Sequence, residues 1–148
     1  MLFCIMIVSR YFVMAEIPEK LCDVLLSISD NKYVILLMCN IFMVIIGMLM
    51  DDVSGMLLCT PLLLPLMTRI GVNPIHFAAI IGVNLGMGNV TPPTAPLLYI
   101  GCRLTGASLA ETLKPTLVML LGAWLPTLLL TTYVPEIALF IPRLFGYV

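Results

Sequence analysis

The sequence predicts an all-α, polytopic membrane protein, and three observations support this class. Hydrophobic residues make up 61% of the chain and charged residues only 10%, whereas a soluble domain has about 25% charged residues. The mean hydropathy is +1.15. Long uncharged runs occur at residues 33–50 and 70–102, and a bilayer core of ~30 Å needs about 20 apolar residues.

Charge, cysteine and histidine content argue against several other classes. The net charge is −1 and the seven basic residues are scattered singly, so no nucleic-acid footprint or polybasic membrane patch is present. The five cysteines share no short spacing, and the single histidine excludes a His-rich metal site. We therefore interpret the cysteines as small apolar packing residues and expect no cofactor.

The first 32 residues predict two short segments. Residues 1–14 are apolar apart from Ser9 and Arg10 and too short to cross a bilayer unaided, so we expect the end of a truncated transmembrane helix in a fragment of a longer protein. Residues 15–32 carry apolar side chains three or four apart with charges mostly between them. That pattern is typical of an amphipathic connector in the membrane interface.

Residues 33–70 predict a re-entrant hairpin with Asp51 and Asp52 at its tip. The first uncharged run ends in GMLMDDVSG, and the second, at residues 56–67, has only about a dozen residues, short of a span. The acids could instead occupy an aqueous loop between two spans, but the short second run and the bracketing glycines favour the hairpin. A carboxylate at mid-membrane costs at least ~2.5–3.5 kcal/mol and is normally kept for a partner or an ion.

Residues 74–102 predict a transmembrane helix broken at residues 86–96, whose sequence is GMGNVTPPTAP. Pro92, Pro93 and Pro96 lack amide protons, and each ring clashes with the carbonyl four residues earlier, so the helix cannot continue through them.

The break predicts a polar centre inside an apolar run. Several carbonyls at residues 86–90 should lose their helical donors, with one half-helix ending at Met87 and another beginning at Ala95. Free backbone groups must be buried in protein or line a wet cavity, and opposed half-helix ends suit a small cation and an anionic solute. The alternative is a kinked structural helix.

Two polar side chains in this segment have competing interpretations. Asn84 lies one turn before the glycine at position 88 and is a candidate substrate or ion contact, or else an interhelical hydrogen-bond partner. We expect His76 near the water interface as a satisfied histidine and not a proton relay. A hydrolase would have to combine Ser54 with Asp51 or His76, but no motif brackets that serine, so we expect no enzyme and no catalytic residue.

The remaining chain predicts a polar loop at residues 103–114, a last transmembrane helix at residues 115–133, and a C-terminal tail at residues 134–148 that caps the surface. Basic residues are shared almost evenly between the two sets of loops, so charge does not determine the orientation.

The order of these motifs resembles the C-terminal portion of the large permease (M-type) subunit of TRAP transporters, the tripartite ATP-independent periplasmic type. The resemblance covers about residues 17–146, and the pairing of an MD-type tip with a TPP break is specific. It rests on GMLMD at residues 47–51, prolines at 61 and 65, GVNPIHF at 71–77, and NLG at 84–86 leading to Thr91-Pro92-Pro93. The family commonly has Val-Gly where this chain has Thr94-Ala95, so we expect a less open backbone there.

This resemblance implies one repeat of an inverted-repeat, elevator-type transporter in the bacterial inner membrane. It implies sodium-coupled import of organic acids of the C4-dicarboxylate, sialic acid or sugar-acid type. The implied partners are a small four-helix TRAP membrane subunit, a periplasmic solute-binding protein and the missing N-terminal half of the permease. The hairpin would open from the periplasmic face, with residues 103–114 in the cytoplasm. A structural or accessory membrane subunit, or a non-functional remnant, is the alternative.

The resemblance also implies which residues form the site. Sodium is then the coupling ion, and no other metal is expected; Asp52 is an alternative to Asp51 for balancing its charge. The sodium-binding candidates are Gly47, Asp51, Gly86, Asn89, Thr91 and Pro92. The substrate-binding candidates are Asn84, Pro93 and Thr94.

Overall fold

The computed structural model describes residues 2–28, 31–92 and 95–146, and all the regular secondary structure in these ranges is helical. This confirms the all-α prediction. In chain order the elements are α1 (Leu2–Met14), α2 (Ile17–Ile28), α3 (Lys32–Leu49), α4 (Asp52–Arg69), α5 (Pro74–Gly88), α6 (Pro96–Thr105), α7 (Leu109–Met119), the π-helical turn η1 (Leu120–Trp124), α8 (Leu125–Tyr133) and α9 (Pro135–Leu144).

The turn between α6 and α7 is shorter than expected. The sequence predicts a polar loop over residues 103–114, but α6 continues to Thr105 and α7 begins at Leu109. The reason is a capping box: Glu111 N donates to Ser108 Oγ, and Ser108 N donates to the Glu111 carboxylate, each at 3.3 Å. The last helical stretch therefore begins six residues earlier than position 115 and runs without interruption from Leu109 to Tyr133.

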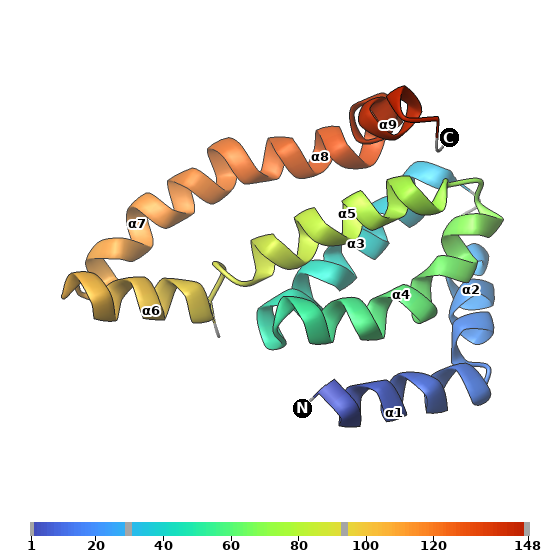
Figure 1. Ribbon diagram of the computed structural model, residues 1–148, viewed down its shortest axis with the longest axis horizontal. Coiled ribbons are helices and arrows are strands. Elements are labelled where there is room, and N and C mark those ends of the chain that lie inside the picture. The colour runs from blue at the N-terminus through green and yellow to red at the C-terminus, as the bar shows by residue number, and fades with distance from the viewer. Residues whose placement is uncertain (1, 29–30, 93–94, 147–148) are drawn as a thin grey trace.

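Figure 1 shows how the helices are arranged. Helices α5 and α6 follow one another along the molecule, and α7, η1 and α8 return beside them. Helices α3 and α4 form an antiparallel hairpin that packs against α5, and α1 packs against α4. The open ends of the hairpin lie close together: Lys32 Nζ at the start of α3 donates to Gly71 O, just after α4, at 3.3 Å.

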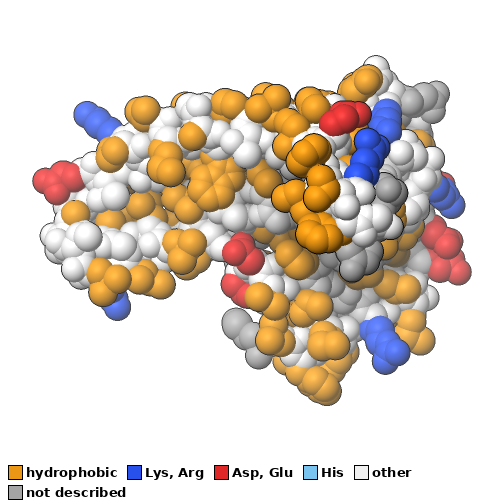
Figure 2. All heavy atoms as spheres, turned by 45° about the horizontal axis from the view of Figure 1, so that its top comes forward, with side chains coloured by type: hydrophobic (Ala, Val, Ile, Leu, Met, Phe, Trp, Pro, Cys, Tyr) orange, Lys and Arg blue, Asp and Glu red, His pale blue; other side chains and the backbone are white. Residues whose placement is uncertain are grey.

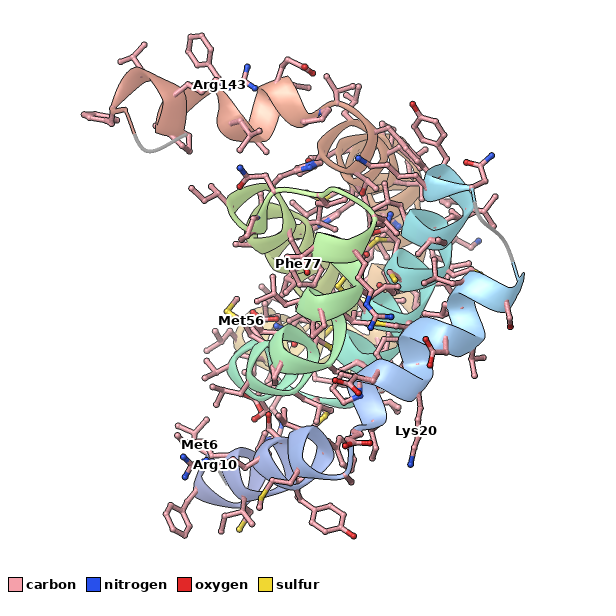
Figure 3. The ribbon with its side chains drawn as sticks, turned by 90° about the vertical axis from the view of Figure 1, so that its right-hand side faces the viewer. Met6, Arg10, Lys20, Met56, Phe77 and Arg143 are labelled. Atoms are coloured by element: carbon pink, nitrogen blue, oxygen red, sulfur yellow. The ribbon has the colours of Figure 1, made fainter. Side chains whose placement is uncertain are left out.

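The core lies between α2, α3, α4 and α5 and is almost entirely apolar. Figure 3 shows Phe77 of α5 among these helices, whereas Lys20 of α2 points away from them. Three of the five cysteines pack inside this core as predicted, whereas Cys4 is exposed and Cys102 is half-buried. Burial raises the pKa of the Cys22 thiol on α2. The buried cluster consists of Cys22, Ile35, Leu36, Cys39, Met43, Cys59, Leu63, Leu66, Met67, Val72, Phe77, Ile80, Ile81 and Leu85.

The surface exposes many large apolar side chains. In Figure 2 apolar side chains cover much of the visible face, and charged side chains are few. Within the described ranges, two helical stretches are long and apolar enough to cross a membrane, namely Lys32–Leu49 and Leu109–Tyr133. Helix α5 is apolar but too short for this on its own, as expected for half of a broken helix.

Two carbonyls that lack an amide partner because of a proline are satisfied from a neighbouring helix. Pro61 has no amide proton to give to Leu57 O, and Ser9 Oγ of α1 donates to that carbonyl at 2.9 Å. Pro135 likewise cannot donate to Thr131 O, which lies 2.7 Å from His76 Nε2. A carbonyl only accepts, so Nε2 carries the proton. His76 is thus a satisfied histidine, buried against α8.

Candidate functional site

The tip of the hairpin and the break after α5 meet through their backbones. A Cβ placed on Gly88 would lie 2.2 Å from the carbonyl carbon of Gly47, and one placed on Gly47 would lie 3.0 Å from Leu85 Cα. Only glycine allows such an approach. Close by, a Cβ on Gly55 of α4 would lie 3.0 Å from the Leu85 side chain. The fold therefore brings the predicted tip and the predicted break into one place.

The break lies where the prolines predict it. Helix α5 ends at Gly88 and α6 begins at Pro96, against predicted ends at Met87 and Ala95. Ala95 adopts φ 32° and ψ 55°, a left-handed conformation that glycine adopts more readily. Helix α6 has no side-chain cap, so its first amides face the break without one. The candidates Pro93 and Thr94 lie outside the described residues.

Two of the carbonyls expected to be free do have donors. Met87 O accepts from Thr91 Oγ1 at 2.7 Å and from Val90 N at 3.3 Å, and Gly88 O accepts from Thr91 N at 3.0 Å. The chain tightens into a short turn after the helix and satisfies these groups locally, which corrects the expectation for Met87 and Gly88. Because the Thr91 hydroxyl donates its proton to Met87 O, the lone pairs of its oxygen remain available to bind a cation.

The unsatisfied buried side-chain oxygens of the described chain lie at the tip, on α5 and at the residue directly after α5. Among the described residues, the buried side-chain oxygens without a hydrogen-bond partner belong to Asp52, Ser54, Asn84 and Asn89. Asn84 and Asn89 are 0% and 6% exposed. Buried polar atoms normally have partners, and exceptions need an explanation. Oxygen atoms of this kind, on segments that touch each other, are suited to bind a cation or a polar solute.

The two neighbouring acids differ in environment. Asp51 accepts a hydrogen bond from Ser54 N at 3.2 Å as the N-cap of α4, and its side chain is exposed in this chain. Asp52 is half-buried, and its Oδ1 is buried without a partner. The geometry therefore favours Asp52, the alternative acid, as the carboxylate that faces the interior.

Asn84 forms part of a buried polar ladder that the sequence does not predict. Its Nδ2 donates to Asn40 Oδ1 at 3.0 Å and to Ile80 O at 2.7 Å, and Asn40 Nδ2 donates to Thr132 Oγ1 at 2.9 Å. The ladder joins α5, α3 and α8. The amide nitrogen of Asn84 thus makes the interhelical hydrogen bond given as one interpretation of this residue, whereas its Oδ1 has no partner.

Two further residues near the site were missed. Asn40 is the one polar residue inside the apolar run of α3, a position where a polar side chain usually has a function. Trp124 donates from Nε1 to Val83 O at 3.2 Å, and its ring lies 3.4 Å from the Cβ position of Gly86. A single tryptophan near the middle of an apolar run was the available signal. Pro92, the remaining candidate, lies half-buried in the turn.

The geometry keeps Ser54 and His76, one of the two pairs considered for a hydrolase, far apart. His76 lies in the first turn of α5 and contacts Thr131, whereas Ser54 lies at the hairpin tip, close to the far end of α5. Twelve residues of helix separate His76 from Gly88, which is about 18 Å at 1.5 Å per residue. A nucleophile and a base must lie within hydrogen-bond reach of each other.

Comparison with known proteins agrees with the sequence motifs. The model of the family "Tripartite ATP-independent periplasmic transporter, DctM component" matches residues 2–137. The isethionate TRAP transporter permease of Oleidesulfovibrio alaskensis is 38% identical over 84% of this chain and 20% of its own length. The sialic acid TRAP transporter large permease of Vibrio cholerae is 34% identical over 89% of this chain and 31% of its own.

The C4-dicarboxylate TRAP transporter large permease of Rhodobacter capsulatus is 33% identical over 91% of this chain and 31% of its own length. This chain thus spans about a third or less of these curated relatives. No solved structure matches it significantly. The resemblance read from the tip and the break is confirmed: the chain belongs to the DctM family of TRAP transporter large permeases, a family of transporters and not of enzymes.

Proposed function

We propose that this chain is the C-terminal part of a sodium-coupled permease for organic acids. In this proposal the hairpin tip and the α5–α6 break hold the sodium ion and one side of the solute site. The relatives are named for isethionate, sialic acid and C4-dicarboxylates, all of which are organic acid anions. The other half of the site, a small four-helix membrane subunit and a periplasmic binding protein complete the system in the inner membrane.

The observation that carries this proposal is the set of unpaired buried oxygens at the tip and on α5. Oxygen atoms are the ligands of a small hard cation, and half-helix C-terminal ends supply such ligands in broken-helix transporters. The C-terminal end of α5 carries the negative end of the helix dipole, and the Asp52 carboxylate adds a full charge. Both favour a cation at this point.

The other side of the break suits an anion. Helix α6 starts at Pro96 without a side-chain cap, so its first amides and the positive end of its dipole face the break. A carboxylate or sulfonate group next to these amides would be stabilised. The anionic headgroup shared by the relatives' substrates is therefore the part of the solute that we place here.

The hairpin is proposed to be re-entrant. The stretch Leu109–Tyr133 has 25 residues, about 37 Å of helix, which exceeds a ~30 Å hydrocarbon core. The hairpin packs against α5, and its tip meets the break. If α5 and α6 together cross the bilayer, a tip that meets the break between them would lie part of the way across, which is the re-entrant arrangement that we propose.

Replacement of Thr91 by valine tests the sodium site. The change removes one oxygen at nearly constant volume and should raise the half-saturating sodium concentration about fivefold, the factor for the loss of ~1 kcal/mol. The measurement is solute uptake in proteoliposomes by this chain joined to the N-terminal part of a family member. Thr105→Val is the matched control, because Thr105 Oγ1 makes the same bond four residues back, to Gly101 O at 2.8 Å, on the exposed side of α6.

Two acid variants sharpen the same test. Asp52→Asn should shift the sodium dependence more than Asp51→Asn. Asp52 is the acid that faces the interior, whereas an asparagine at position 51 can still cap α4. If Thr91→Val and Asp52→Asn both leave the sodium dependence unchanged in protein that inserts normally, the break is a structural kink.

An accessory or non-functional subunit is the second candidate. We expect no uptake by the 148-residue chain alone, even with its proposed partners, because half of the solute cavity is absent. Sodium-driven uptake by this chain alone would contradict that expectation. If the joined permease does not transport either, the accessory role is favoured.

A further inference from the structure

We propose that Trp124 is a positioning residue for the break, which it serves by holding the last turn of α5 against the hairpin tip. The proposal gives a role at the proposed ion and solute site to a residue on the last long helix, so it rests on the proposed function of that site.

Trp124 reaches the backbone of α5 at two points. Its Nε1 donates to Val83 O at 3.2 Å. Its ring carbon Cζ2 lies 3.4 Å from the position that a Cβ on Gly86 would occupy. Because position 86 is glycine, the ring packs against the helix itself and not against a mobile side chain. Both contacts lie within the last two turns before the break.

The same turn is held on its opposite side by the hairpin. Gly86 and Gly88 are two residues apart, which places them about 200° apart around the helix axis. Gly88 contacts the backbone of Gly47 on α3, and Gly86 faces Trp124. The end of α5 is therefore enclosed between the tip and the tryptophan, and loss of either would let it move.

The indole ring lies between two open pockets. Open pockets of about 420 Å³ and 350 Å³ lie beside it, and among the described residues Trp124 lines both. Gly82 and Ala123 line the second cavity, and Gly82 and Gly122 have open space where a Cβ would be. Removal of the ring would join the two cavities and leave the last turns of α5 without this support.

The sequence places the ring here through a local distortion. Pro126 cannot donate to Gly122 O, and its ring would clash with that carbonyl in a regular helix. The chain widens instead into the π-helical turn Leu120–Trp124, closed by Leu125 N donating to Leu120 O. One extra residue in a turn shifts the helix phase by about 100°, and such turns occur frequently at functional sites.

Cysteine labelling of the 148-residue chain in vesicles tests the proposal. One reporter chain has cysteine only at position 90, through Val90→Cys beside the break, with the five native cysteines replaced by alanine. A second retains only Cys39, which is 1% exposed in the core and reports on the fold as a whole. Each receives Trp124→Ala, Trp124→Phe or the control Leu121→Ala, whose side chain is 63% exposed on the same helical stretch.

With potassium as the cation, Trp124→Ala should raise the maleimide labelling rate at position 90 by about fivefold or more, the factor for the loss of roughly one hydrogen bond with its packing. Trp124→Phe keeps a ring but no donor and should give a smaller increase. Leu121→Ala should change neither reporter, and Cys39 should stay protected in every variant. An unchanged rate at position 90, or an equal increase at Cys39, overturns the proposal.

Repeating the measurement in sodium on the Val90→Cys reporter chain that keeps Trp124 separates this proposal from the proposed function. If sodium does not slow labelling at position 90 relative to potassium, the sodium site is contradicted, whereas the role of Trp124 is decided by the rates in potassium alone.

Discussion

The contact between Gly47 and Gly88 predicts that one added methyl group will separate the hairpin from the break. In Gly88→Ala the new Cβ would lie 2.2 Å from the carbonyl carbon of Gly47, 2.5 Å from its Cα and 2.6 Å from Met48 N. All three are backbone atoms, so no side-chain rotation relieves the clash. Non-bonded carbons prefer about 3.5–4.0 Å, so α3 and α5 must move apart by about 1 Å or more.

The expected cost follows from this overpacking. Inserting a methyl group into a packed contact typically costs about 1–3 kcal/mol. Gly88 is the last residue of α5, so the gain in helix propensity offsets little of this. Gly82→Ala is the matched control: it lies in the same helix, has open space where its Cβ would be, and should stabilise the chain by about 0.5–1 kcal/mol.

The assay is SDS-driven unfolding of the purified chain in detergent micelles, followed by far-UV circular dichroism. Gly88→Ala should unfold at a lower SDS fraction than the unsubstituted chain, and Gly82→Ala at a higher one. Because both changes are Gly→Ala in α5, their opposite signs isolate the contact with Gly47. A Gly88→Ala chain as stable as the unsubstituted one would refute the close approach of tip and break.

Three further outcomes follow from the same structure. Ser9→Ala should cost about 0.5–1.5 kcal/mol but less in a Pro61→Ala background, where residue 61 regains an amide for Leu57 O; a double-mutant cycle that shows no coupling would contradict this. Ala95→Gly should relieve the left-handed conformation and stabilise the chain by about 1 kcal/mol, whereas the control Ala78→Gly inside α5 should destabilise it in the same unfolding assay. Cysteines at Tyr33 and Arg69 should be labelled from the same face of the membrane, and labelling from opposite faces would exclude a re-entrant hairpin.

The helix ends around the break could be predicted because their causes are local. Pro92, Pro93 and Pro96 act on their own amides and on carbonyls four residues away, so α5 and α6 end and begin within one residue of the predicted positions. The membrane class could likewise be predicted, because the mean hydropathy depends on the composition and not on how the chain folds. The prediction of a polar loop at residues 103–114 was wrong. It relied on the charged residues there and overlooked the capping box of Ser108 and Glu111, which is also a local signal.

The partners across the bundle depended on tertiary structure. Nothing near Leu57 or Thr131 in the sequence shows that Ser9 and His76 satisfy these carbonyls, because the relative positions of the helices decide it. The choice between Asp51 and Asp52 has the same character, since one residue of difference decides which acid caps α4 and which turns inward.

The break of a helix inside an apolar run, and the tight acidic turn before it, could be predicted without the structure, because prolines, glycines and hydropathy act over a few residues. The contact of Gly47 with Gly88, the link from Asn84 through Asn40 to Thr132, and the bond from Trp124 to Val83 O arise only in the packed structure. These contacts join segments up to 92 residues apart. They depend on the crossing points and rotations of packed helices, which side-chain periodicity along a single helix does not determine.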